Sequence, residues 1–64
     1  MKQQEELAYI MYDEYCAAVG GKAFNGDVLP SSDEFFTDDA KTKQADAWRA
    51  AAGAAIEFLA DYNK

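Results

Sequence analysis

Two long segments of the chain repeat their hydrophobic residues with the period of an α-helix, and a short segment rich in turn-forming residues separates them. In residues 3–19, apolar side chains recur every three or four positions, which places them on one face of a helix. The residues of this stripe are Leu7, Ala8, Met11, Tyr12, Tyr15, Cys16 and Val19. Tyr9 and Ile10 lie beside the stripe, so the apolar surface is wider than one neighbouring helix covers.

Residues 20–30, GGKAFNGDVLP, form the connector between the two segments. Gly20-Gly21 predicts the end of the first helix, because a left-handed residue commonly follows a helix C-terminus. Asn25-Gly26 predicts a tight turn of type I′, whose two central positions both need positive φ. We expect Phe24 and Leu29 to pack this loop onto the core.

Lys22 after a double glycine raises the question of a phosphate-binding loop. That motif needs GxxxxGK[ST] after a strand, whereas Lys22 follows a predicted helix and precedes Ala23. Lys22 is therefore predicted to be an exposed lysine rather than an anion site. The sequence suggests no structural role for Lys22 or for Asp27, the two charged residues of the connector.

The second half of the chain begins with two helix-start signals. Ser31 and Glu34 have the spacing of a capping box, which predicts a short helical turn at residues 31–36 anchored by Phe35 and Phe36. A second cap within residues 37–39 starts a long helix over about residues 38–62. Its heptad-like seam is Ala45, Trp48, Ala52, Ala55, Leu59 and Tyr62, and its neighbouring strip is Ala47, Ala51, Ala54 and Phe58.

The alanine-rich part of this helix predicts a close approach of the first helix, because small side chains leave room for large ones. We expect Tyr12 and Tyr15 to pack against the small residues of the last helix, with Trp48 as the largest contribution to the core. The small residues concerned are Ala51, Ala52 and Ala55. Gly53 is predicted to be either an exposed position or a contact point for a second chain.

These elements predict a single small all-α domain over residues 1–64: two long antiparallel helices joined by a compact loop and a short helical turn. A compact chain of 7.1 kDa exposes roughly 4,100 Å². At this size, hydrophobic burial and conformational entropy nearly cancel, so burial against a second copy or another partner would supplement the stability of a monomer.

Charge and composition narrow the classes of function. Twelve acidic and six basic residues give a net charge of −6, which argues against direct binding of nucleic acid. One cysteine and no histidine argue against zinc, and Cys16 is predicted to be a core thiol because no histidine is present to activate it. The acidic residues near the helix starts are predicted to cap helices rather than to hold a cation or form a catalytic pair; they are Asp33, Glu34, Asp38 and Asp39.

The chain also shows no targeting signal that we recognise. Its N-terminal segment lacks a basic flank and carries carboxylates through its apolar part, and no apolar run approaches the ~20 residues of a membrane span. We therefore expect a cytoplasmic protein with no membrane partner.

The order of these motifs resembles a group of small uncharacterised proteins encoded by bacteriophages and prophages. Their shared skeleton is a tyrosine-bearing first helix, a Gly-Gly-Lys stretch, a Gly-Asp-x-Leu-Pro turn and an Ala-Trp followed by alanines. The matching residues, within about residues 8–59, are Tyr12, Tyr15, Gly20, Gly21, Lys22, Gly26, Asp27, Leu29, Pro30, Ala47 and Trp48. Where relatives often carry a tryptophan after Leu-Pro, this chain has Phe35 or Phe36. The resemblance implies a phage or prophage origin and a compact helical domain, and it transfers no activity.

The leading functional hypothesis is a non-enzymatic protein-interaction module, with a protein partner that is either another protein or a second copy of the chain. Its candidate interface residues, which one two-helix contact cannot all bury, are Tyr9, Ile10, Ile56 and Phe58. No catalytic, cofactor or metal residues are predicted. One alternative is an acidic counter-defence inhibitor that occupies the nucleic-acid groove of a host protein. Another is a small nucleotide-binding protein, in which Lys22, Arg49 and an aromatic residue would have to converge.

Overall fold

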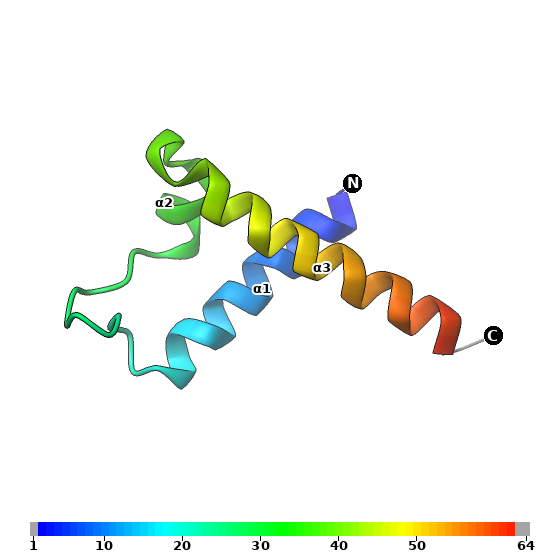
Figure 1. Ribbon diagram of the computed structural model, residues 1–64, viewed down its shortest axis with the longest axis horizontal. Helices are drawn as coiled ribbons and strands as arrows, with labels where there is room; N and C mark the ends of the chain where they lie inside the picture. Colours follow the sequence, from blue (N-terminus) through cyan, green and yellow to red (C-terminus); the bar gives the residue numbers. More distant parts are fainter. Residues whose placement is uncertain (1, 63–64) are drawn as a thin grey trace.

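The structure, a computed structural model, describes residues 2–62 and contains helices and no β-strand in that range. Helix α1 spans Lys2–Ala18, α2 spans Ser32–Thr37, the 3₁₀ helix η1 spans Asp39–Lys41 and α3 spans Thr42–Tyr62 (Figure 1). The all-α prediction is confirmed, as are the two long helices joined by a compact loop and a short helical turn. The predicted last helix differs in its first turn, which is the separate element η1.

The two predicted caps begin the short elements. The Ser31 hydroxyl accepts a hydrogen bond from the backbone N–H of Glu34 at 3.4 Å, and α2 follows it directly. The Asp38 carboxylate accepts one from the N–H of Ala40 at 2.9 Å and starts η1. Side-chain oxygens of this kind satisfy N–H groups that have no partner within the helix, so local signals place these starts correctly.

The core lies where α1 crosses α3, with α2 packed against both helices (Figure 1). Its buried residues are Ala8, Tyr12, Phe35, Phe36, Ala45 and Ala52. Ala8 of α1 and Ala45 and Ala52 of α3 have small side chains, which allow the two helix backbones to approach closely. Contacts along α1 run backwards along α3, from Gln4 near Gly53 to Tyr15 beside Trp48, as expected for antiparallel helices.

Tyr12 is the centre of an aromatic cluster whose members are Tyr9, Tyr12, Phe35, Phe36 and Trp48. Its ring stacks on Phe35 at 4.3 Å between centroids and meets Phe36 and Trp48 edge-on at 5.8 and 5.7 Å. Tyr9 stacks on Phe36 at 4.4 Å. The predicted packing of Tyr12 against the alanine run therefore missed the contribution of α2, which supplies two of the rings around it.

Tyr12 also ties the connector to the core. It is 2% exposed, and its hydroxyl donates a hydrogen bond of 2.8 Å to the backbone carbonyl of Pro30. Burial is the main cause that raises the pKa of the Tyr12 phenol, and a side-chain interaction with Cys16 is the next. The phenol therefore stays neutral and able to donate a hydrogen bond. Tyr12 is the largest fully buried side chain, whereas Trp48 is only partly buried, so the prediction that Trp48 contributes most to the core was wrong.

Gly53 contacts α1 of its own chain. The side-chain amide of Gln4 donates a 2.7 Å hydrogen bond to the carbonyl of Arg49, one turn before Gly53. A Cβ atom added at Gly53 would lie 2.7 Å from the Gln4 Nε2 atom. Gly53 is partly buried, so the prediction of an exposed position was wrong, and its missing side chain makes room for Gln4 within the same molecule. Contact of Gly53 with a second chain stays a prediction.

The last turns of α3 extend past α1. The seam predicted along α3 is buried at Ala45 and Ala52 and partly buried at Ala55, but Leu59 is 53% and Tyr62 76% exposed. Because the two helices cross, their contact ends before α3 does (Figure 1). The molecule extends over 43 × 24 × 15 Å and exposes 4873 Å², against the roughly 4,100 Å² of a compact chain of this mass.

Candidate functional site

One concave surface lies between the end of α1 and the connector, and its geometry begins with two glycines. The N–H of Gly20 donates to the carbonyl of Ala17 at 3.2 Å, and the N–H of Gly21 donates to that of Cys16 at 2.8 Å. With φ of 76° at Gly20 and 77° at Gly21, these bonds form a Schellman motif that ends α1. Both glycines thus adopt the left-handed conformation predicted for one of them.

The connector then forms a miniature hairpin rather than the predicted type I′ turn. Lys22 and Val28 form an isolated antiparallel bridge, Ala23 donates to the carbonyl of Asp27 at 2.9 Å, and Gly26 donates to the carbonyl of Ala23 at 2.9 Å. Only Gly26 in this turn has positive φ, at 91°, whereas a type I′ turn needs it at two positions. The pattern is that of a three-residue loop with a bulge at glycine.

Asp27 has a structural role that the sequence did not reveal. Its backbone N–H donates to the Asn25 side-chain oxygen at 3.0 Å, and the Asn25 amide nitrogen donates to the Asp27 carboxylate at 3.0 Å. The two side chains thereby hold the turn from both sides. The N–H of Leu29 closes the base of the hairpin by donating to the carbonyl of Gly21 at 2.9 Å.

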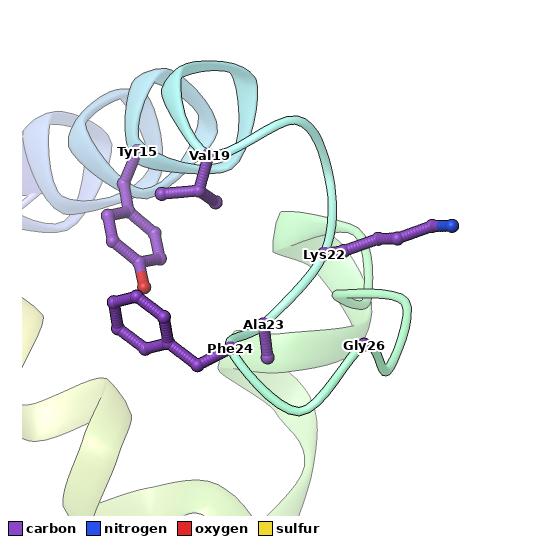
Figure 2. A pocket seen from close by; sticks show the side chains of 6 residues that line it. All are labelled: Tyr15, Val19, Lys22, Ala23, Phe24 and Gly26. Carbon is purple, nitrogen blue, oxygen red and sulfur yellow. The ribbon is translucent and has the colours of Figure 1, made fainter.

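The hairpin carries Phe24 into solvent. Phe24 is fully exposed, so the prediction that it packs onto the core was wrong. Its backbone lies in a turn fixed by local hydrogen bonds, and this turn projects away from the crossing of the helices (Figure 1). Phe24 instead borders a groove of about 490 Å³, which we call the connector groove; its lining residues are Tyr15, Val19, Lys22, Ala23, Phe24 and Gly26 (Figure 2).

Lys22 contributes its backbone to this groove and directs its side chain away from it (Figure 2). Within residues 2–62, no ion pair involves Lys22. Arg49 is engaged elsewhere, near the start of α1, with two carboxylates. The nucleotide-binding alternative requires Lys22 and Arg49 to lie close together, and the structure does not bring them together.

A second uncovered apolar surface lies at the end of α3. Phe58 is 65% exposed, and its ring stacks on that of Tyr62 at 6.0 Å between centroids. Leu59 lies beside them on the same side of the helix, because positions 58, 59 and 62 fall within one arc of about 100°. We call Phe58, Leu59 and Tyr62 the terminal face.

The four predicted interface residues do not share one surface. Ile10 is 57% exposed and borders a groove of about 410 Å³ with Tyr9, which is itself partly buried against Phe36. Ile56 is partly buried in a smaller groove beside Gln4. Phe58 lies on the opposite side of α3 from Ile56, because residues two apart in a helix are separated by about 200°.

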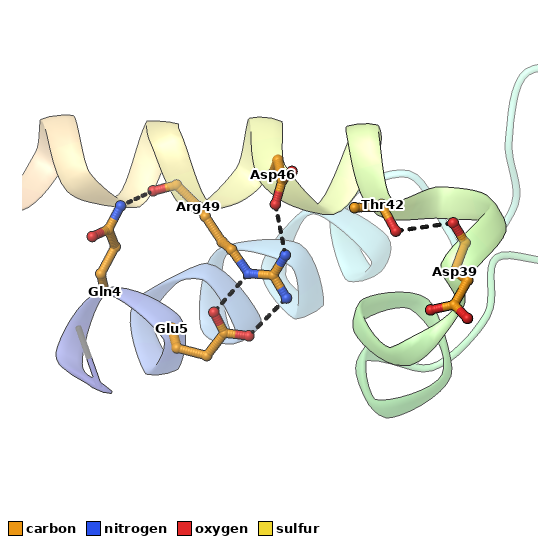
Figure 3. A network of polar contacts seen from close by, with 6 residues as sticks. All are labelled: Gln4, Glu5, Asp39, Thr42, Asp46 and Arg49. Carbon is orange, nitrogen blue, oxygen red and sulfur yellow. Dashed lines mark hydrogen bonds and ion pairs between the residues drawn. The ribbon is translucent and has the colours of Figure 1, made fainter.

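The polar network between α1 and α3 centres on Arg49 (Figure 3). Its guanidinium donates to both carboxylate oxygens of Glu5, at 2.7 and 3.0 Å, and to Asp46 at 2.9 Å. It also lies 5.4 Å from the centre of the Phe36 ring. The hydrogen bond from Arg49 lowers the pKa of Glu5. The hydrogen bonds to Glu5 and to Asp46 raise the pKa of Arg49. All these contacts are internal, so the network fastens the two helices at the crossing.

The remaining polar candidates have structural roles or form no site. The acidic residues at the helix starts include the caps described above, and no cluster within residues 2–62 has the three ligands that would suit a metal ion. Cys16 is partly buried against the core, in agreement with its predicted role as a core thiol.

Sequence reasoning missed that Phe24, Leu59 and Tyr62 are exposed. One signal was available for the terminal face. Helix α3 has 21 residues and α1 has 17, so the apolar seam of α3 is longer than the helix that can cover it. No comparable signal marked Phe24, because the hairpin's direction depends on how the chain leaves the Schellman motif.

Comparisons of the chain with protein-family models, with curated proteins and with solved structures found no match. Among the described helices, none combines the length and the apolar character needed to cross a bilayer.

Proposed function

We propose that the protein is a non-enzymatic protein-interaction module of phage or prophage origin that acts in the cytoplasm of a bacterial host. The origin and the location rest on the motif resemblance and on the sequence. The interaction role rests on one observation: several of the largest apolar side chains are exposed although the chain has few residues with which to build a core. They include Ile10, Phe24, Phe58, Leu59 and Tyr62.

The exposed apolar side chains support a protein partner because of their residue types and because some of them lie next to one another. Scattered single apolar residues are ordinary on a protein surface, whereas contiguous apolar patches mark interaction sites. The aromatic residues Phe24, Phe58 and Tyr62 are of the type enriched where proteins meet. Rigid aromatic side chains also lose little conformational entropy when they bind.

The distribution of charge favours this role over an acidic inhibitor that imitates nucleic acid. Such an inhibitor would present a spaced double row of carboxylates. Here Glu5 and Asp46 are neutralised by Arg49, and Asp27 is bonded to Asn25. A further group gathers at the starts of α2 and η1: Asp33, Glu34, Asp38 and Asp39.

A pull-down from bacterial lysate tests the proposal. The full chain is immobilised beside a triple variant, Ile10→Ser, Phe24→Ser and Phe58→Ser, and beside a control variant, Ala17→Ser, at another exposed position. We expect the wild type and the control to retain the same protein, or added soluble copies of the chain, and the triple variant to lose it. Equal retention by all three baits, or no retained protein at all, would contradict the proposal.

A further inference from the structure

Two of the uncovered apolar surfaces in the described part of the chain have opposite shapes. The connector groove is concave and is bordered by Tyr15, Val19 and Phe24, whereas the terminal face projects from the end of a helix. We infer that the terminal face of a second copy occupies the connector groove, and that the reciprocal contact closes a dimer with two-fold symmetry. This inference rests on the proposed interaction role and names the partner.

The exposed area matches what such a dimer needs. The chain exposes 4873 Å², roughly 800 Å² more than a compact chain of its mass. A stable interface of standard size buries about 800 Å² on each partner. Burying an interface of that size would therefore bring the exposed area of each copy close to that of a compact protein.

The groove is organised before anything binds. The Schellman bonds of Gly20 and Gly21 fix the direction in which the chain leaves α1, and the Leu29–Gly21 hydrogen bond closes the hairpin. The pairing of Asn25 with Asp27 holds the turn that carries Phe24. A surface fixed in this way loses little conformational entropy on association, which favours binding.

The free end of α3 is long enough to act as the inserted element. Tyr62 lies seven positions after Ala55, the last partly buried residue of the seam, which corresponds to a rise of about 10 Å along the helix. The groove of about 490 Å³ lies in the size range of pockets that enclose small ligands, so it has room for side chains of the terminal face.

Charge opposes this pairing at low ionic strength. Lys22 is the sole basic residue in residues 3–40 of the sequence, and its side chain is directed away from the groove (Figure 2). Residues 50–62, which include the terminal face, contain two carboxylates and no basic residue. Two copies at −6 each therefore repel overall. Added salt should screen this repulsion and strengthen the dimer.

Symmetry decides whether the contact closes. The groove of one copy contacts a different surface, the terminal face, on the other copy, so each contact is heterologous. Such contacts build an open chain of copies unless the terminal face of the first copy also occupies the groove of the second. The end of α1 with the connector and the end of α3 form two arms that diverge from the crossing of the helices (Figure 1). The first arm carries the residues of the groove, and the second carries those of the terminal face. Two copies facing each other with their arms interlocked satisfy both contacts at once.

Sedimentation of the full chain up to millimolar concentration tests the inference. We expect a monomer–dimer equilibrium that tightens with added salt. Phe24→Ser in the groove and Leu59→Ser on the terminal face should each raise the dissociation constant roughly tenfold or more. Ile10→Ser is the matched control, because Ile10 is similarly exposed but belongs to neither surface. Circular dichroism checks that each variant keeps its helices.

Mixing the two weakened variants distinguishes this arrangement from other dimers. In a mixed dimer, the intact groove of the Leu59→Ser copy meets the intact terminal face of the Phe24→Ser copy. Both substitutions then fall in the other contact, where Phe24 and Leu59 meet each other, so losing both side chains there costs about as much as losing one. We therefore expect the mixture to dimerise more tightly than either variant alone. A dimer built face to face from like surfaces would gain nothing from mixing, and that result would overturn the inference, as would equal weakening by Ile10→Ser.

A strictly monomeric wild type at millimolar concentration would also overturn the inference without deciding the proposed function. If that monomer still retained a bacterial protein that the triple variant lost, the interaction role would stand with a different partner. Failure of both experiments would remove both proposals.

Discussion

At the crossing of α1 and α3, Tyr12 lies among three aromatic rings, whereas Phe24 at the tip of the connector is fully exposed. Both are aromatic residues in a chain that can bury few side chains. Tyr12 is held by residues distant in sequence, while the position of Phe24 is set by hydrogen bonds within a few residues of it. Tertiary packing therefore governs the centre of the molecule, and local backbone geometry governs its ends.

The largest predicted effect tests the centre. Tyr12→Ala should cost about 3–5 kcal/mol, because it removes a buried ring and leaves a cavity between α1 and α2. In a domain of this size, that loss is enough to unfold the chain. Urea denaturation followed by circular dichroism measures it.

Tyr12→Phe is the control for the ring alone. It removes only the hydroxyl and leaves the Pro30 carbonyl without its hydrogen bond, so we expect a cost of about 1 kcal/mol and a folded protein. A Tyr12→Ala variant as stable as Tyr12→Phe would show that the aromatic cluster does not hold the core.

The sequence predicted most of what depends on local signals. Helical periodicity, the glycine stop and the caps of Ser31 and Asp38 all mark positions in the sequence where the structure has them. What it could not predict is which faces meet. Periodicity places Tyr12 on the inner face of α1, but the arrival of Phe35 and Phe36 beside it depends on how the connector returns the chain.

The second prediction concerns the ion pair that fastens the edge of the crossing. Arg49→Ala should cost about 1 kcal/mol or less, because Glu5 is partly exposed and Asp46 is exposed, so solvent screens both carboxylates. Arg49→Lys keeps the positive charge but loses the bidentate hydrogen bonding to Glu5. We therefore expect it to recover only part of the stability that Arg49→Ala loses.

The same pair predicts a dependence on pH. The folded-state pKa of Glu5 is lowered from its usual 4.5, so its stabilising contribution is complete above that value and is lost as the pH falls through the lowered pKa. The difference in unfolding free energy between wild type and Glu5→Gln should therefore shrink in acid. A difference that stays constant below pH 4.5 would contradict the assignment.

The third prediction concerns Gly53. Gly53→Ala gains about 1 kcal/mol of helix propensity but displaces the Gln4 amide from the Arg49 carbonyl, a loss of similar size. We expect a net change near zero in the wild type. In a Gln4→Ala background the same substitution should stabilise the protein by about 1 kcal/mol. An equal gain in both backgrounds would mean that Gln4 and Gly53 are not coupled.

The smallest predicted effect tests the ends. At concentrations low enough to keep the chain monomeric, Phe24→Ser and Phe58→Ser should each change the unfolding free energy by less than about 0.5 kcal/mol, because both side chains are exposed. Thermal unfolding measures the change. A cost above about 1.5 kcal/mol for either would remove the contrast between the centre and the ends.

The meeting of Gln4 with Gly53 also bears on how many arrangements of the helices compete. Residues 50–55 present six small positions in a row, and a surface so uniform offers a neighbouring helix several nearly equivalent registers along it. Only at Gly53 is there room for a side-chain amide to reach the backbone carbonyl of Arg49. A slide of α1 by one turn toward the start of α3 would bring Gln4 beside Ala50, whose methyl group fills the space that Gly53 leaves, and a slide the other way would bring it beside Ile56. Either slide breaks the bond to the Arg49 carbonyl, so the missing methyl group of Gly53 favours the observed register.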